Sequence, residues 1–297
     1  MRWLNKIWSA LAAAPAASRE SKSRLGLETL SDRVVPSAIV GDFGSSGIYR
    51  WTSAAGWSQL TTSNPEGPGG LAVANDGDTV VADFGSAGMS RWTKAGGWKQ
   101  LTTANPQQIS VADNGTVLGD FGTSGLYTWT TAAGWKQITT ANPEDIAISW
   151  NGVVVGDFGS SGLYTWSTSA GWKQVTTSNP EDIAVSSDNS VIGDFGASGV
   201  YRWTSSAGWK QLTTANPTSI SAGDGGMFVA DFGSSGVYTW NTGTGWKQIT
   251  TADPQAVHAA DGGEVAADYG SSGVYRWTAS AGWKQITTAD PEYIWVG

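Results

Sequence analysis

The sequence repeats one short unit seven times, and this periodicity restricts the possible folds more than any other feature. Each unit contains an Asp followed by an aromatic residue and Gly, and the Asp falls at Asp42, Asp83, Asp120, Asp157, Asp194, Asp231 and Asp268. The first interval is 41 residues and the other five are 37, because residues 64–70 insert a Gly- and Pro-rich turn. Such a chain is expected to fold as an array of equal supersecondary units.

Each unit predicts four short β-strands. In one copy, turn signals separate strand candidates at residues 145–149, 153–158, 163–167 and 172–176. The first strand carries small side chains that suit a crowded axis, whereas Tyr and Trp on the third and fourth fill the wider space between diverging units. Four strands in each of seven units indicate an all-β fold, a seven-bladed β-propeller with four-stranded blades.

The two ends of the repeated region are incomplete units that complement each other. Residues 37–61 supply three strands without a first strand, and residues 292–296 match the start of a unit. The sequence therefore predicts a blade closed by one C-terminal plus three N-terminal strands, which removes the open edges of the ring. An open solenoid, the alternative, is expected to carry atypical capping units. The predicted domains are a leader over residues 1–36 and the propeller over residues 37–297.

Composition argues against several functions. The chain has no Cys and one His, His258, which removes thiolate metal sites and most His-based catalysis. The chain has 17 basic and 25 acidic side chains, and residues 1–36 hold six of the basic and three of the acidic ones. The predicted ring therefore has a net charge near −11 and is expected to repel nucleic acid. No stretch is apolar over the about 18 residues that a membrane span requires. We expect no cofactor, no metal and a monomer.

The segment before the repeats contains a motif related to export. Residues 24–37 read Arg-Leu-Gly-Leu-Glu-Thr-Leu-Ser-Asp-Arg-Val-Val-Pro-Ser. This resembles the Leu-Glu-x-Leu-x-x-Arg-x-x-Pro-Ser leader on many exported or surface proteins of budding bacteria with unusual peptidoglycan, and it departs from that pattern at Ser31, where Glu is usual. The resemblance implies a secreted or cell-surface protein. The alternative is a basic tail without fixed structure.

The seven repeated Asp residues allow two interpretations. A ring of carboxylates is able to bind calcium or sugar hydroxyls. Each Asp, however, precedes a tight loop, typically Phe-Gly-Ser-Ser-Gly, whose N–H groups a carboxylate readily accepts, and Gly44 and Gly47 with their counterparts supply the backbone angles of that loop. The Asp-x-Asp-x-Asp-Gly spacing of a calcium loop is also missing. The sequence therefore favours a structural role for these carboxylates.

Two Trp and one Gln recur in every unit and form the candidate binding site. The second Trp and the Gln two residues later share one face of the predicted fourth strand. A Trp beside a fixed amide is a typical platform for a sugar ring. The predicted ligand-binding residues are Trp57, Gln59, Trp98, Gln100, Trp135, Gln137, Trp172, Gln174, Trp209, Gln211, Trp246, Gln248, Trp283 and Gln285. The alternative is that the Trp residues pack between blades and the Gln bonds the neighbouring blade's backbone.

Repetition also predicts the type of function. An enzyme requires one unique constellation of groups, whereas this polar set occurs in seven equal copies, so we expect no enzyme and no catalytic residue. Residues 37–297 resemble propellers of near-identical amplified repeats and are similar in logic to tachylectin-type lectins, which implies a sugar site in each blade. The sequence thus predicts multivalent carbohydrate binding, with glycans as partners. The alternative is a protein–protein interaction scaffold with a patch that breaks the sevenfold symmetry, most strongly at residues 67–78.

Overall fold

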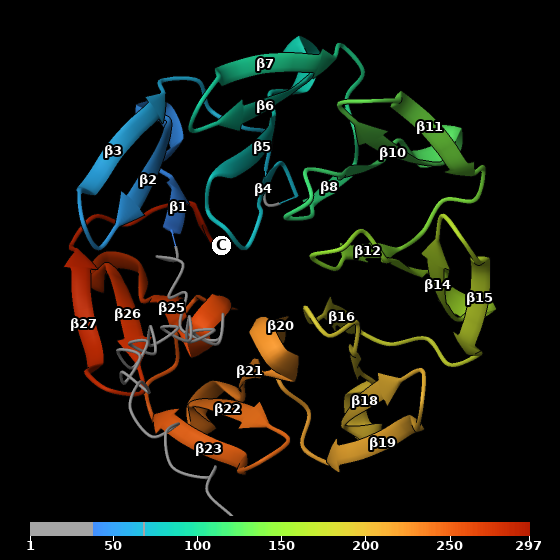
Figure 1. Ribbon diagram of the computed structural model, residues 1–297. Helices are drawn as coiled ribbons and strands as arrows, with labels where there is room; N and C mark the ends of the chain where they lie inside the picture. Colours follow the sequence, from blue (N-terminus) through green and yellow to red (C-terminus); the bar gives the residue numbers. More distant parts are fainter. Residues whose placement is uncertain (1–37, 68) are drawn as a thin grey trace, which may run out of the picture. The chain divides into compact units, whose positions relative to one another are not determined.

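The computed structural model describes residues 38–67 and 69–297, so the predicted leader lies outside the described residues. The described residues belong to one compact unit. Its described part forms seven four-stranded antiparallel sheets arranged as blades around a central axis (Figure 1). The prediction of an all-β, seven-bladed β-propeller is confirmed. In the described residues, no helix is long and apolar enough to cross a membrane.

The blades are numbered 1 to 7 in chain order, and each contains an inner, a second, a third and an outer strand (Figure 1). The inner strands are β28 (Tyr293–Val296), β4 (Leu71–Val73), β8 (Gln108–Val111), β12 (Asp145–Ile148), β16 (Asp182–Val185), β20 (Ser219–Ala222) and β24 (Ala256–Ala259). The second strands are β1 (Ala38–Asp42), β5 (Thr79–Asp83), β9 (Val117–Asp120), β13 (Val154–Asp157), β17 (Val191–Asp194), β21 (Phe228–Asp231) and β25 (Val265–Asp268). The third strands are β2 (Ile48–Thr52), β6 (Met89–Thr93), β10 (Leu126–Thr130), β14 (Leu163–Ser167), β18 (Val200–Thr204), β22 (Val237–Asn241) and β26 (Val274–Thr278). The outer strands are β3 (Gly56–Thr61), β7 (Gly97–Thr102), β11 (Gly134–Thr139), β15 (Gly171–Thr176), β19 (Gly208–Thr213), β23 (Gly245–Thr250) and β27 (Gly282–Thr287).

Blade 1 closes the ring as the sequence predicts. The C-terminal strand β28 pairs with β1 in antiparallel register, with Val40 opposite Trp295 and Asp42 opposite Tyr293. The backbone N–H of Ala38 also donates to the oxygen of Gly297 at 2.8 Å. One C-terminal strand and three N-terminal strands therefore complete a single blade, and the free edge of β1 is satisfied by main-chain hydrogen bonds.

A 3₁₀ turn joins the second and third strands of every blade. In blade 1 the backbone N–H of Gly44 donates to Asp42 Oδ1 at 2.9 Å, which is the structural role that the sequence favours. Gly47 has a φ of 87°, and a Cβ at this position would collide with the backbone of Thr61 and Thr62. The turns are η2 (Gly44–Ser46), η3 (Gly85–Ala87), η4 (Gly122–Ser124), η5 (Gly159–Ser161), η6 (Gly196–Ser198), η8 (Gly233–Ser235) and η10 (Gly270–Ser272). Two further 3₁₀ turns, η7 (Asp224–Gly226) and η9 (Asp261–Gly263), follow the inner strands of blades 6 and 7.

The hydrophobic core lies between neighbouring blades. Val155 and Leu163 of blade 4 pack against Ile183 and Val191 of blade 5. The junction between blades 7 and 1 is packed in the same way, and it includes Ile294 of the closing strand, which is 1% exposed. Burial of one such side chain contributes about 1.5–3 kcal/mol, so the closing strand is held by packing as well as by hydrogen bonds.

Candidate functional site

The predicted Trp and Gln residues lie at the rim of the ring, on the face that each blade turns toward the preceding one. In blade 6, Trp246 lies opposite Trp240 across the β22–β23 hairpin, and Gln248 lies opposite Tyr238. Paired residues share a sheet face, so these four side chains lie on one side of the blade. Trp240 packs on the buried core shared with blade 5. The Tyr238 side chain lies near Thr213, at the end of the outer strand of blade 5.

The second Trp of each unit has a structural contact. Trp246 Nε1 donates to the backbone oxygen of Leu212 in the preceding blade, at 3.1 Å. The equivalent pairs are Trp57 with Ile286, Trp98 with Leu60, Trp135 with Leu101, Trp172 with Ile138, Trp209 with Val175 and Trp283 with Ile249. One edge of every indole is therefore committed to holding two blades together, while each ring remains only half-buried.

The repeated Gln is held by its own blade and not by its neighbour. Gln248 Nε2 donates to the backbone oxygen of Ser235 in η8, at 2.7 Å. The equivalent pairs are Gln59 with Ser46, Gln100 with Ala87, Gln137 with Ser124, Gln174 with Ser161, Gln211 with Ser198 and Gln285 with Ser272. The alternative expectation of a bond to the neighbouring blade is thus not what the geometry shows. All seven side chains are exposed, so the chain carries seven oriented amides on its rim.

A hollow opens between blades 5 and 6 beside this Trp and Gln. Its volume is about 360 Å³, and it is lined by Thr213 and Ala215 of blade 5 and by Phe232, Ser235, Tyr238 and Trp246 of blade 6. The Phe232 ring meets the Tyr238 ring at 5.5 Å with an interplanar angle of 88°. It meets the Trp246 ring at 5.5 Å and 75°. The hollow therefore has aromatic walls, and Ser235, whose carbonyl orients the Gln248 amide, lies at its edge.

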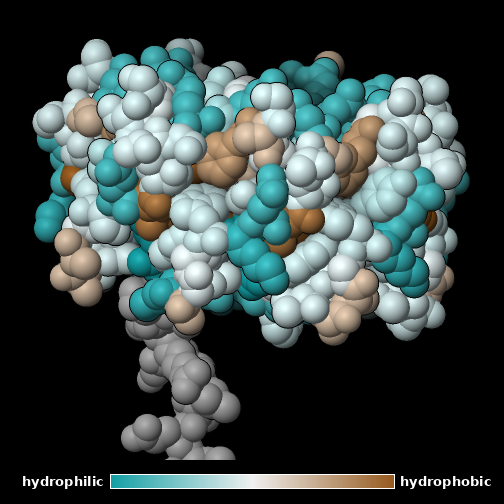
Figure 2. All heavy atoms as spheres, turned by 90° about the horizontal axis from the view of Figure 1, so that it is seen from above, coloured by the Kyte–Doolittle hydropathy of each residue, from teal (hydrophilic) through white to brown (hydrophobic). Residues whose placement is uncertain are grey.

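The aromatic set of this hollow recurs around the ring with one exception. Edge-to-face contacts between the loop Phe and the third-strand Tyr are present in blades 1, 3, 4, 5 and 6, and blade 7 has Tyr269 in place of the Phe. Blade 2 carries Ser90 where the other six blades carry Tyr, although its Phe84 still packs on Trp98 at 5.6 Å. Figure 2, which shows the ring from its side, shows hydrophobic surface only as small separate patches along the rim.

The repeated Asp carboxylates are not open to a ligand, because they lie beneath the 3₁₀ turns and are at most 4% exposed. Burial raises the pKa of Asp42 to about 6, against the opposing effect of the Gly44 N–H bond. When the Asn64 amide is oriented so that its nitrogen faces the carboxylate, it donates to Asp42 Oδ1 at 2.9 Å. These groups therefore belong to the packing of each blade.

The inner strands differ from blade to blade, unlike the rim. Asp182 Oδ2 of blade 5 accepts the backbone N–H of Ile220 in blade 6, at 3.0 Å. Burial, together with the charge of Asp182, raises the pKa of Asp145 to about 7. On the inner strands of blades 7 and 1, His258 stacks on Trp295 with ring centres 5.8 Å apart, and burial lowers the pKa of His258 to about 4. Unique polar and aromatic groups thus gather near the axis.

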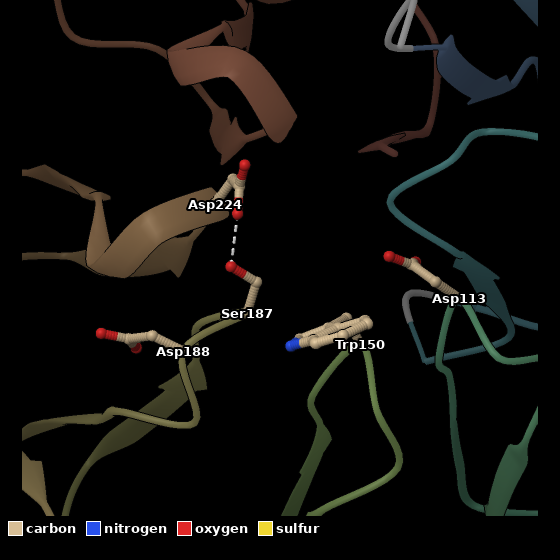
Figure 3. Close-up of a pocket in the computed structure, with 5 residues that line it drawn as sticks. All are labelled: Asp113, Trp150, Ser187, Asp188 and Asp224. Carbon is tan, nitrogen blue, oxygen red and sulfur yellow. Dashed lines mark hydrogen bonds between the residues drawn. The ribbon is translucent and has the colours of Figure 1, made fainter. Parts of the chain in front are cut away.

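A second hollow lies where the turns after the inner strands of blades 3 to 6 meet. Its volume is about 280 Å³, and its lining residues are Asp113, Trp150, Ser187, Asp188 and Asp224. Figure 3 shows the Trp150 indole between Asp113 on one side and Ser187, Asp188 and Asp224 on the other. Trp150 is 46% exposed. The sequence contained a signal for this site, because the other complete turns have Asn, Asp or Ser where blade 4 has Trp.

Comparisons with known proteins show the fold and no family. No family model matches the chain, and no curated protein matches it. Among solved structures, virginiamycin B lyase from Staphylococcus aureus is similar with a TM-score of 0.52 at 15% identity, over 75% of this chain and 85% of that one. A Bacteroides fragilis protein assigned as a 6-phosphogluconolactonase is similar with a TM-score of 0.53 at 12% identity, over 91% of this chain and 99% of that one. U3-55K is similar with a TM-score of 0.53 at 11% identity, over 77% of this chain and 84% of that one.

The prediction that the chain is not an enzyme is wrong. The ring shares its fold with virginiamycin B lyase and with the protein assigned as a 6-phosphogluconolactonase, so a propeller of this shape is compatible with catalysis. The prediction failed because it treated the whole molecule as seven equal copies, whereas the rim repeats and groups such as Trp150 and His258 occur in one unit each. Among the described residues, no group of three or more His, Asp or Glu side chains is arranged to hold a metal ion.

Proposed function

We propose that this protein binds carbohydrate through the hollows between the outer parts of neighbouring blades. The observation that supports the proposal is the hollow walled by Phe232, Tyr238 and Trp246, with the oriented Gln248 amide beside it. Aromatic faces match the apolar C–H face of a sugar ring, and a fixed amide matches its hydroxyls. Repetition around the ring makes the sites multivalent, so weak single sites add up on a dense glycan surface. Export to the cell surface is part of the proposal and rests on the leader motif at residues 24–37.

The test is a glycan array probed with the full chain and with two variants. Changing all seven Gln from Gln59 to Gln285 into Ala is expected to abolish surface binding, since avidity multiplies the loss at each site. Each change also removes a hydrogen bond of about 1 kcal/mol, so the fold of this variant must be checked by circular dichroism. The second variant replaces the six rim Tyr residues by Ser, the residue that blade 2 naturally carries. A folded variant that binds as before would contradict the proposal.

An interaction scaffold is the second candidate, and it requires a patch that breaks the sevenfold symmetry. The segment expected for it, residues 67–78, is partly used in the ring itself. Arg50 of blade 1 donates to the backbone oxygen of Gly77 at 2.6 Å and to Asp78 at 2.8 Å. The hollow around Trp150 is a stronger departure from symmetry, and it favours a partner at that face. A change confined to this hollow would then remove partner binding, while the seven Gln changes would not.

A further inference from the structure

We propose that the hollow around Trp150, here called the turn-face hollow (Asp113, Trp150, Ser187, Asp188 and Asp224), binds an organic cation that carries a guanidinium or alkylammonium group. The site is separate from the rim hollows and does not depend on their function. The site combines the exposed Trp150 indole with the carboxylates of Asp113 and Asp224, which form no ion pair within the described residues, and these groups enclose one hollow.

The ring buries Trp150 only in part, because this residue is 46% exposed. Its turn is closed by Ser149 and Val153, since Ser149 N donates to Val153 O at 2.9 Å, and Gly152 N donates to Ser149 O at 2.9 Å. Trp150 lies at the tip of that turn and is the one large apolar side chain in the described residues that is exposed. One exposed apolar side chain alone indicates no ligand, but this indole also lines a hollow that holds three carboxylates, and so it offers an aromatic face to a ligand there.

The carboxylates around the indole are not all neutralised. Asp188 is paired with Arg202 at 2.7 Å. The other ion pairs found among the described residues join Arg50 and Lys94 to Asp78 and Arg276 to Glu264, and none includes Asp113 or Asp224. Asp113 accepts the backbone N–H of Asn75 at 2.6 Å, and Asp224 accepts the Ser187 hydroxyl. These hydrogen bonds orient the two carboxylates without supplying a positive charge. Burial, together with the charges of Asp76 and Asp224, raises the pKa of Asp113 to about 6, so the site carries both negative charges at pH 7 and above.

The combination selects a cation over other ligands. A guanidinium or ammonium group is attracted to the face of Trp, the strongest of the aromatic platforms, and carboxylates flanking the ring add Coulombic attraction and hydrogen-bond acceptors. Anions are repelled by the same carboxylates. A neutral sugar would use the indole face but would gain nothing from the two unpaired charges. The volume of about 280 Å³ suffices for one such side chain and excludes a folded domain.

The test uses N-acetyl-arginine amide and N-acetyl-citrulline amide, which have nearly the same shape and differ in charge. Binding to the full chain is followed by the indole N–H resonance of Trp150 in ¹H–¹⁵N spectra, which is assigned by its loss in Trp150→Phe. We expect the arginine probe to shift this signal with a Kd of about 1–10 mM, as one cation–π contact and two carboxylates at an open site allow. The citrulline probe is expected to bind at least about 10-fold more weakly. Equal binding of the two probes, or no shift with either, would overturn the proposal.

Variants separate the platform from the charges. Trp150→Ala removes the platform, and its binding is followed through the other resonances that the arginine probe shifts. Asp224→Asn keeps an acceptor for the Ser187 hydroxyl and removes the charge, and Asp113→Asn does the same for the Asn75 N–H. Each variant is expected to weaken the arginine probe by about 5-fold or more, and 0.5 M salt should weaken it further. Unchanged affinity in Trp150→Ala or in the double Asn variant would refute the site.

The matched control is Asp253→Asn, which removes an exposed carboxylate on the crossing between blades 6 and 7, outside the turn-face hollow. It should leave the affinity unchanged, and an equal loss there would mean that only net charge matters. A pentapeptide with a central Arg distinguishes the source of the cation. A gain of about 10-fold over the free probe indicates a segment of a protein partner, and equal affinity indicates a small free cation.

Discussion

Trp57 Nε1 donates a hydrogen bond to the backbone oxygen of Ile286 at 3.1 Å, across 229 positions of sequence. The equivalent bond between Trp172 and Ile138 spans only 34 positions. The junction between blade 1 and blade 7 therefore uses the same contact as the junctions between blades that follow one another in the chain. On the outer side of the ring, this closing junction has the same Trp contact as the other junctions. Closure itself depends on the pairing of β28 with β1 on the inner side.

Removal of residues 291–297 should destabilise the ring strongly. The deletion takes away β28, exposes the edge of β1 and opens the packed cluster that includes Ile39 and Ile294. We expect the free energy of unfolding to fall by at least about 3 kcal/mol, in the range for loss of a packed element. Urea unfolding followed by circular dichroism measures the effect. An unchanged unfolding midpoint would show that the C-terminal strand does not close the ring.

A finer test compares Ile294→Ala with Ile183→Ala. Both residues occupy the second position of an inner strand, and they are 1% and 7% exposed. Each substitution leaves a cavity and should cost about 2–5 kcal/mol. If the closing blade is packed as tightly as an internal one, the two costs should agree within about 1 kcal/mol in urea titrations. A much smaller cost for Ile294→Ala would indicate that β28 frays from the ring.

The fold was predictable because each requirement of a blade is local in sequence. Asp42, Gly44 and Gly47 mark the 3₁₀ turn, and the 37-residue period repeats it. The observed strand bounds differ slightly from the predicted ones. The predicted strand at residues 153–158 corresponds to β13, which ends at Asp157, because the Phe158 N–H donates to Gly162 O across the loop. These shifts follow from hydrogen bonds between backbone groups, which the side-chain pattern does not specify.

The binding sites were less predictable because they depend on contacts between units. The Trp and Gln of the rim could be named from the sequence, but the partner of Gln248 could not, since the loop carbonyl and the neighbouring blade were equally accessible in principle. The turn-face hollow was missed because Asp113, Trp150 and Asp224 come from three different units. The repeat pattern describes what the units share and does not relate positions that differ between them. The closed ring places these three residues around one hollow.

Stability should increase as the pH is lowered from 7 to 5. Burial raises the pKa of Asp42, Asp83, Asp157, Asp194 and Asp268 to about 6, which is above the unfolded value of about 3.9. Between these two values the folded state binds more protons than the unfolded state, so the free energy of unfolding rises as the pH falls. The urea midpoint at pH 7, 6 and 5 measures this dependence.

His258 opposes this trend between pH 7 and 5. Burial lowers the pKa of His258 to about 4, so below about pH 6.5 the unfolded state takes up a proton there that the folded state does not. A single imidazole is outweighed by the five carboxyls. The control is Asp42→Asn with Asp83→Asn, which should reduce the slope of stability against pH. A midpoint that falls steadily from pH 7 to 5 would contradict the raised pKa values.

The last prediction concerns blade 2 and follows from the proposed carbohydrate site. Blade 2 has Ser90 where Tyr238 stands in blade 6, so it lacks one of the rim aromatic residues while it keeps Trp98, Gln100 and the loop Phe. If the Tyr ring is part of the site, the natural chain has six full sites, and blade 2 binds weakly. We expect Ser90→Tyr to create the seventh site, because an aromatic stacking contact is worth about 0.5–1.5 kcal/mol beyond its buried area.

The measurement follows the indole N–H resonances of Trp98 and Trp246 while a soluble form of the best glycan from the array is added. In the natural chain the Trp246 signal should shift and the Trp98 signal should stay in place. In Ser90→Tyr both should shift, with single-site affinities that agree within about threefold, and binding to a dense glycan surface should tighten. Ser90→Ala is the matched control and should behave as the natural chain does. If Trp98 already responds in the natural chain with the affinity of Trp246, the Tyr ring does not belong to the site, and the six Tyr→Ser changes should then leave glycan binding intact.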